Sequence, residues 1–175
     1  MTPFVQVAFE RVIGHSPDVV WEALTSSRSL DRWFMTASLE PRVGGVASFD
    51  AGEGSTTGTV TAWDPPRALA YSWPFPQGGD AHVAWTLEAR DGGAATLLRL
   101  VHTALPADWA AGYGGGWHAY LDRLAAHLAG DEPPDWAERR GLVELGRGRT
   151  VLRDPEGMAR LARLPPSQAG SSGPA

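Results

Sequence analysis

Between residues 42 and 103 the chain alternates apolar and polar residues, and turn sequences rich in Gly, Pro and Asp interrupt this pattern. A period of two is typical of strands with one buried face, and short turns of this composition join antiparallel neighbours. The turns divide the segment into five predicted strands, at about 42–49, 57–63, 68–74, 81–90 and 95–103. The chain therefore has to build an antiparallel sheet whose apolar face needs a cover.

The residues on either side supply a sixth strand and that cover. Val5, Val7, Phe9 and Ile13 share one phase of a strand, and Ser16-Pro17-Asp18 has the Ser cap and first-turn Pro of a helix start. A second short helix is expected around residues 29–34. A helical stripe then runs to a stop at Gly130, through Tyr113, Trp117, Tyr120, Leu121, Leu124 and Leu128. The predicted class is α+β: an antiparallel sheet of about six strands, two short helices after the first strand, and a long C-terminal helix.

A cluster of helix breakers, Asp131-Glu132-Pro133-Pro134, marks the expected domain boundary. Residues 1–130 hold 8 Arg against 13 acids, whereas residues 131–175 hold 7 of each. In this extension Asp154-Pro155-Glu156 predicts the start of a short helix over residues 155–164. That helix is expected to dock on its own domain, to meet a protein partner or to be frayed, and residues 167–175 are expected to be disordered.

Composition excludes several classes of chemistry. The 175 residues include no Cys and no Lys, which excludes thiolate chemistry, disulfides and Schiff bases. The net charge of -5 argues against a nucleic-acid surface, and no apolar run approaches a membrane span. The first residues lack the apolar core of a signal peptide. We therefore expect a cytoplasmic protein with no cofactor, no nucleic-acid partner and no membrane partner.

The sequence resembles a known family in several segments that follow one another in order: Glu10-Arg11-Val12-Ile13, Ser16-Pro17-Asp18-Val19-Val20-Trp21-Glu22-Ala23-Leu24, Asp31-Arg32-Trp33-Phe34, Gly44-Gly45, Gly58-Thr59-Val60, Asp64-Pro65-Pro66-Arg67-Ala68-Leu69-Ala70-Tyr71-Ser72-Trp73 and Gly116-Trp117. Together they are similar to bacterial homologues of the activator of the ninety-kilodalton heat-shock protein's ATPase, in the START-like (SRPBCC, birch-pollen-allergen-like) superfamily. The resemblance covers residues 4–130. It implies a helix-grip fold, in which a curved antiparallel sheet wraps around the long helix and encloses an apolar cavity. Members of this superfamily bind diverse hydrophobic molecules, and some are polyketide cyclases.

Hairpin geometry predicts which side chains face that cavity. If Gly92-Gly93 is the turn, opposed residue numbers sum to 185, so Val83 faces His102 and Trp85 faces Leu100. The opposite face then carries the polar residues His82, Thr86, Glu88, Arg90 and Arg99. For the hairpin at Pro65-Pro66, opposed residue numbers sum to 131. This register predicts that Trp63 faces outward and that the inward side chains are Val60, Ala62, Leu69, Tyr71 and Trp73.

The predicted ligand-binding residues combine the inward sheet positions with the helix stripe and Arg11. They are Arg11, Tyr71, Trp73, Val83, Trp85, Leu100, His102, Tyr113, Trp117 and Tyr120. These residues also have a simpler structural interpretation. In it the aromatic residues belong to the core, His102 is bonded to a backbone carbonyl, and Arg11 forms an internal ion pair. Gly112 and Gly114–Gly116, in the long helix, indicate either close backbone packing or a mobile lid.

Three functions remain open. The first is binding of a small hydrophobic or aromatic molecule by a protein that is not an enzyme. The second is a cyclase or dehydratase with His102 as its catalytic acid and base. The third is a co-chaperone-like interaction module whose protein partner binds the C-terminal extension. A metal site is not expected, because His118 and His127 lie on opposite sides of the helix.

Overall fold

The computed structural model of the chain describes residues 4–52, 54–75, 79, 81–140, 143–146, 149–152 and 159–162. In chain order its elements are β1 (Phe4–Ile13), α1 (Pro17–Thr25), α2 (Ser27–Trp33), β2 (Thr36–Leu39), β3 (Val46–Asp50), β4 (Ser55–Asp64), β5 (Ala68–Ser72), β6 (His82–Arg90), η1 (Asp91–Gly93), β7 (Ala95–Pro106), η2 (Ala107–Trp109), α3 (Ala110–Ala129), α4 (Trp136–Arg140), β8 (Val143–Gly146), β9 (Arg149–Leu152) and β10 (Ala159–Ala162). One antiparallel sheet has the strand order β10-β1-β7-β6-β5-β4-β3-β2, and β8 and β9 form a separate pair.

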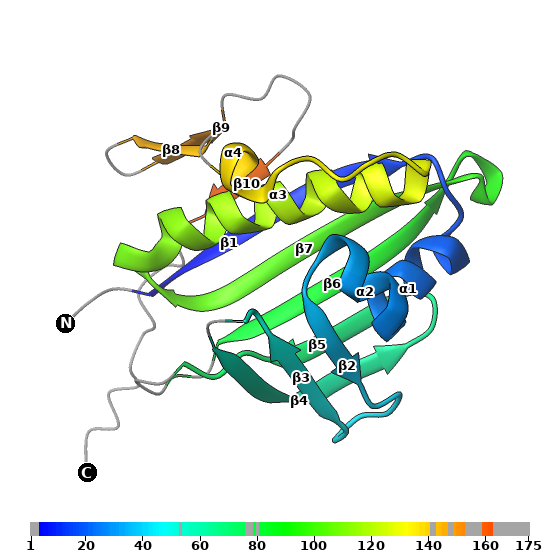
Figure 1. Cartoon of the computed structure of the whole chain (residues 1–175), viewed down its shortest axis with the longest axis horizontal. Coiled ribbons are helices and arrows are strands. Elements are labelled where there is room, and N and C mark those ends of the chain that lie inside the picture. Colours follow the sequence, from blue (N-terminus) through cyan, green and yellow to red (C-terminus); the bar gives the residue numbers. More distant parts are fainter. Residues whose placement is uncertain are drawn as a thin grey trace, which may run out of the picture.

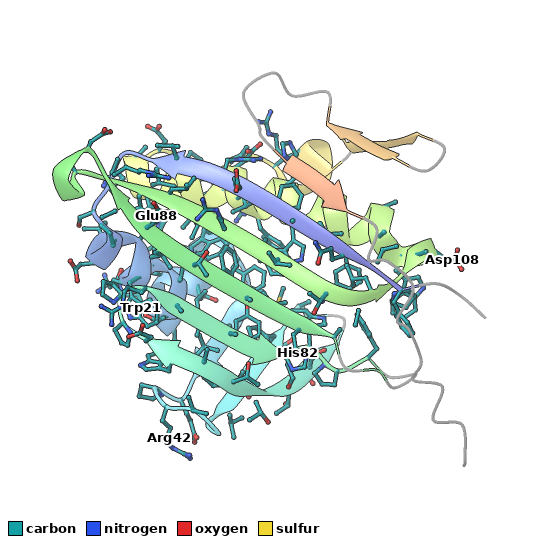
Figure 2. All side chains as sticks on the ribbon, turned by 180° about the vertical axis from the view of Figure 1, so that it is seen from behind. Trp21, Arg42, His82, Glu88 and Asp108 are labelled. Carbon is teal, nitrogen blue, oxygen red and sulfur yellow. The ribbon has the colours of Figure 1, made fainter. Side chains whose placement is uncertain are left out.

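Helix α3 runs along one face of the curved sheet, and α1 and α2 lie together at one end (Figure 1). The covered face is apolar: the side chains of Val7, Phe9, Val83, Trp85 and Leu100 are each at most 2% exposed. The other face, turned to the viewer in Figure 2, carries polar residues such as His82 and Glu88. There Arg99 binds Glu10 and Glu88 at 2.9 and 3.0 Å. The predicted helix-grip fold is confirmed.

The helix boundaries follow the signals in the sequence. Pro17 opens α1 after an extended Ser16, although the side chain of Ser16 makes no capping hydrogen bond. Helix α2 begins two residues before its predicted start, because Ser26 accepts a hydrogen bond from the Ser29 amide at 3.5 Å and serves as its cap. Helix α3 ends at Gly130, which has the left-handed φ of 78° that glycine tolerates best.

The register of β6 and β7 is the predicted one. Val83 lies opposite His102, Trp85 opposite Leu100, and every other pair in this hairpin sums to 185 as well. The connection is a four-residue loop, residues 91–94, rather than a two-residue turn. Because both loops are centred on the same point, the register and the sorting of side chains between faces are unchanged.

A bulge changes the predicted register of β4 and β5. Val60 pairs with Tyr71 as expected, but between Val60 and Ala62 the register shifts by one, and Trp63 then pairs with Leu69. A one-residue shift moves a side chain to the other face, so the outward orientation predicted for Trp63 is wrong. Its indole packs edge-on against Trp21 of α1, with ring centroids 5.2 Å apart.

Two strands of the large sheet were not expected from the sequence. Strand β2 is only four residues long, too short for its alternation to be recognised, and it closes the far edge of the sheet beside β3. Strand β10 pairs with β1 through Val7 opposite Leu161 and Phe9 opposite Ala159. The helix predicted over residues 155–164 is therefore wrong at Ala159–Ala162. A short isolated helix is marginal, whereas the edge of β1 offers backbone hydrogen bonds to an incoming strand.

The other residues of that predicted helix, and the tail at 167–175 that was expected to be disordered, lie outside the described part of the chain. The domain boundary at residue 130 stays a prediction. Directly after it, α4 packs on α3: Arg139 of α4 donates a hydrogen bond from Nε to the Asp122 carboxylate of α3 at 2.6 Å. The first part of the extension thus lies against its own domain.

Candidate functional site

A pocket of about 530 Å³ lies between α3 and the ends of the sheet strands. Seven of its twelve lining residues are aromatic, and the full lining is Phe34, Met35, Ala51, Trp73, Asp108, Trp109, Gly112, Tyr113, Gly116, Trp117, Tyr120 and Trp136. A volume of this size, with a mostly aromatic wall and few polar groups, is typical of small-molecule sites.

Helix α3 forms one side of the pocket through a stripe at helical spacing. Tyr113, Trp117 and Tyr120 line the pocket, and Gly112 and Gly116 lie one turn apart on the same side. A Cβ atom built on Gly116 would meet only the Trp136 ring, at 3.6 Å. At this position the glycine therefore leaves room in the pocket, and it is not forced by close packing of α3 on the sheet.

The aromatic side chains of the pocket contact one another and fix its shape. Phe34 stacks on Trp117 at 5.5 Å and meets Tyr120 edge-on at 4.6 Å. Trp73 lies edge-on to Trp117 at 6.3 Å, and Trp109 reaches the core through Phe75 at 5.1 Å. Such contacts hold the rings in place more firmly than isolated side chains on a surface.

His102 is fully buried behind this wall and does not line the pocket. Its Nδ1 accepts a hydrogen bond from Trp117 Nε1 at 3.0 Å, so the neutral ring carries its proton on Nε2. Burial lowers the pKa of His102 to about 3, with a smaller contribution from His82. Within the described residues Nε2 has no hydrogen-bond partner. His102 is thus a neutral side chain that orients Trp117.

The other inward sheet residues lie in the core beneath the pocket. Tyr71, Val83, Trp85 and Leu100 are each at most 3% exposed. Trp85 Nε1 donates a hydrogen bond to the Tyr71 hydroxyl at 3.2 Å, which satisfies the buried indole. Burial raises the pKa of Tyr71, so its hydroxyl stays protonated. Of the predicted ligand-binding residues, only Trp73, Tyr113, Trp117 and Tyr120 line the pocket.

Arg11 lies in a different place from the other predicted site residues. It borders a second cavity of about 320 Å³, between the end of β1 and the far side of α3, together with His15, Asp122 and Arg139. Its guanidinium Nη2 lies 3.3 Å from Nδ1 of the buried His118, whose Nε2 is 3.6 Å from Asp122. Arg11 therefore takes part in a polar network that joins β1 to α3, and it does not reach the aromatic pocket.

Few polar groups face the aromatic pocket. Burial raises the pKa of the Tyr113 hydroxyl, and a hydrogen bond with Trp73 partly offsets this shift. Burial also raises the pKa of the Tyr120 hydroxyl, and the positive charge of Arg123 partly offsets that shift. Both phenols are therefore neutral donors at physiological pH. Asp108, on η2 at the edge of the molecule, is the charged member of the lining (Figure 2).

Eight lining residues were not among the predicted site residues, although two of them could have been. Gly112 and Gly116 follow the helical phase of Tyr113 and Tyr120, and their cost to the helix marked them as unusual. The others are Phe34, Met35, Ala51, Asp108, Trp109 and Trp136, which come from loop ends, η2 and α4. No local pattern places such residues beside α3.

Among the described residues, no group of three or more His, Asp or Glu side chains could hold a metal ion. None of the helices described is both long enough and apolar enough to cross a bilayer.

Comparison with known proteins agrees with the fold and the sequence segments above. Residues 14–129 match the model of the family described as activator of Hsp90 ATPase homolog 1-like protein. The chain belongs to this family. The match ends at the last residue of α3, so α4, with Trp136, lies beyond the part that the family model describes. A search of curated proteins found no significant match.

Solved structures of similar proteins share the helix-grip fold of this family member. MLL2253 from Mesorhizobium loti is 26% identical with a TM-score of 0.65, over 71% of this chain and 96% of that one. CalU16 from Micromonospora echinospora is 26% identical with a TM-score of 0.64, over 78% and 83% of the two chains. DynU16, described as a putative protein in the dynemicin biosynthetic locus, is 28% identical with a TM-score of 0.66, over 73% of this chain and 48% of that one.

Proposed function

We propose that this protein binds a small, uncharged aromatic molecule in the pocket between α3 and the ends of the sheet strands. The observation that carries the proposal is the lining: seven aromatic side chains surround about 530 Å³ of space. Burying the apolar surface of a ligand there is favourable by roughly 25 cal/mol per Å². The glycine at position 116 supports the proposal, because it leaves the pocket open at the expense of helix stability.

The polar groups of the lining favour a ligand with a hydroxyl or carbonyl group. Tyr113 and Tyr120 are neutral phenols that can donate a hydrogen bond to a ligand oxygen. The Asp108 carboxylate can accept one from a ligand hydroxyl and disfavours anionic ligands. The description of DynU16 as a putative protein in a biosynthetic locus makes an intermediate or product of small-molecule biosynthesis the first class of ligand to test.

An enzyme that uses His102 as its acid and base has less support. A general base has to come within hydrogen-bonding reach of the proton that it removes, and His102 lies behind Trp117. A pKa of about 3 also leaves the imidazole with little tendency to take up a proton near neutral pH. The role of His102 in this proposal is to hold the Trp117 ring that the ligand contacts.

The test is calorimetric titration with 2-naphthol, a flat bicyclic phenol. The wild-type protein is expected to bind one equivalent. Gly116→Leu, which places a side chain in the pocket, is expected to weaken binding at least tenfold. Ala125→Leu makes a similar change on the exposed side of α3 and is expected to bind like the wild type. Unchanged binding by Gly116→Leu would contradict the proposed site, and no heat of binding with 2-naphthol or with related bicyclic and tricyclic phenols would contradict the proposed function.

A further inference from the structure

The residues that follow α3 supply one wall of the aromatic pocket. The Trp136 side chain of α4 lies against α3, with its ring 5.7 Å from that of Tyr120 and its Cζ2 atom beside Gly116. Trp136 also belongs to the lining of the pocket, together with Phe34 and Trp117. Figure 1 shows α4 beside α3. The indole therefore closes a side of the pocket that residues 14–129 leave open.

Charged and polar contacts fix this wall in place. Arg123 of α3 donates from Nη1 to the Pro134 carbonyl at 2.9 Å, and from Nε and Nη2 to the carbonyls of Trp33 and Arg32 at 3.0 and 3.2 Å. Phe34 directly follows Trp33, and Trp136 follows Pro134 by two residues. One guanidinium thus joins two parts of the pocket rim, the α2 end and the start of α4, at a set separation.

A second contact fixes the orientation of α4 itself. Arg139 lies one helical turn after Trp136 and binds the Asp122 carboxylate of α3, which is only 16% exposed. A charge-assisted contact at a partly buried carboxylate is stronger than a typical surface ion pair. Arg139 does not line the aromatic pocket, so it can act on a ligand only through the position of α4.

We propose that Trp136 is a specificity-determining residue of the pocket, which selects flat aromatic ligands over saturated ones of the same skeleton, and that Arg139 is its positioning residue. The inference rests on the proposed function. An indole presents a flat face with a negative electrostatic potential. The edge or face of a second aromatic ring packs against that face more favourably than the buried area alone provides. A puckered ring on the same skeleton gains only the area contribution.

The experiment compares 2-naphthol with decahydro-2-naphthol, which has the same carbon skeleton and hydroxyl group but no aromatic ring. The ratio of their dissociation constants is measured by calorimetry. The wild type is expected to prefer 2-naphthol about tenfold, and Trp136→Ala is expected to reduce the preference to less than threefold while still binding both compounds. Trp136→Phe, which keeps an aromatic ring, is expected to retain most of it.

Arg139→Gln tests the positioning role. On its own it is expected to lower the preference, and in the Trp136→Ala background it should have no further effect, because it acts through the indole. Arg99→Gln breaks the ion pairs of Arg99 with Glu10 and Glu88 on the outer face of the sheet and is expected to leave the preference unchanged.

The outcomes separate this inference from the proposed function. An unchanged preference in Trp136→Ala, or equal binding of the two compounds by the wild type, overturns the role of Trp136 and leaves the binding function standing. An effect of Arg139→Gln that persists in full in the Trp136→Ala background overturns the positioning role. Binding of neither compound by the wild type overturns the inference, and the proposed function is overturned with it only if the related bicyclic and tricyclic phenols also fail to bind.

Discussion

Replacing Gly116 with Ala is expected to stabilise the protein, although the position is buried in the middle of α3. Ala is about 1 kcal/mol more favourable than Gly inside a helix, and part of this difference comes from the smaller entropy of the unfolded chain. The new methyl group would meet only the Trp136 ring, at 3.6 Å, which is ordinary van der Waals contact. No steric term therefore opposes the gain, and the free energy of unfolding should rise by about 0.5–1 kcal/mol.

Urea denaturation followed by circular dichroism measures this change as a higher midpoint with an unchanged slope. For a chain of this size the melting temperature should rise by roughly 1–4 °C. Ala125→Gly, the reverse change at an exposed position of α3, serves as the control and is expected to lose about 1 kcal/mol. A loss of more than about 0.5 kcal/mol in Gly116→Ala would refute the reasoning, because it would mean that the backbone at Gly116 packs without room for a methyl group.

Three further changes test the buried polar groups and the bulge. Tyr71→Phe leaves the buried Trp85 N–H without its acceptor and should cost about 1–3 kcal/mol in urea denaturation; a change under about 0.5 kcal/mol would contradict this. In the unfolded chain His102 takes up a proton below about pH 6.5, whereas in the folded chain its pKa is about 3. The stability that this group contributes is therefore lost as the pH falls from about 6.5 to about 3, by up to about 1.4 kcal/mol per pH unit. His102→Gln should therefore show a smaller loss of stability than the wild type between about pH 7 and pH 5, and equal losses would argue against a depressed pKa. Trp63→Ala should cost about 1–3 kcal/mol through lost packing on Trp21, whereas an outward-facing Trp63 would make the change nearly neutral.

The order of the central strands and the register of β6 and β7 could be read from the sequence because they depend on local patterns. A period of two sorts side chains between faces, and the loop around Gly92 centres the hairpin, so the positions of Val83, Trp85, Leu100 and His102 follow from counting. The stripe from Tyr113 to Tyr120 likewise depends only on helical spacing. The fold and four lining residues of the pocket were therefore within reach of the sequence.

The bulge at β4 and the strand β10 required the tertiary structure. A bulge keeps the same alternating residues and only changes which of them pair, so counting across the hairpin cannot detect it. Residues 159–162 follow the helix-start sequence Asp154-Pro155-Glu156, but their partner is the edge of β1, which lies about 150 residues earlier in the chain. Long-range backbone pairing in the sheet outweighed the local preference for a helix, which is worth less than about 1 kcal/mol per residue.

The sequence by itself determined that this chain folds as a sheet covered by a long helix, since each element carries its own periodic pattern. Only the tertiary structure decided where the pocket opens and which residues surround it. The rim is formed by Phe34 after α2, Ala51 after β3, Trp109 in η2 and Trp136 in α4, four segments that are distant in the chain and share no pattern. They meet because the sheet curves around α3, and the contacts of Arg123 and Arg139 then hold α4 against it.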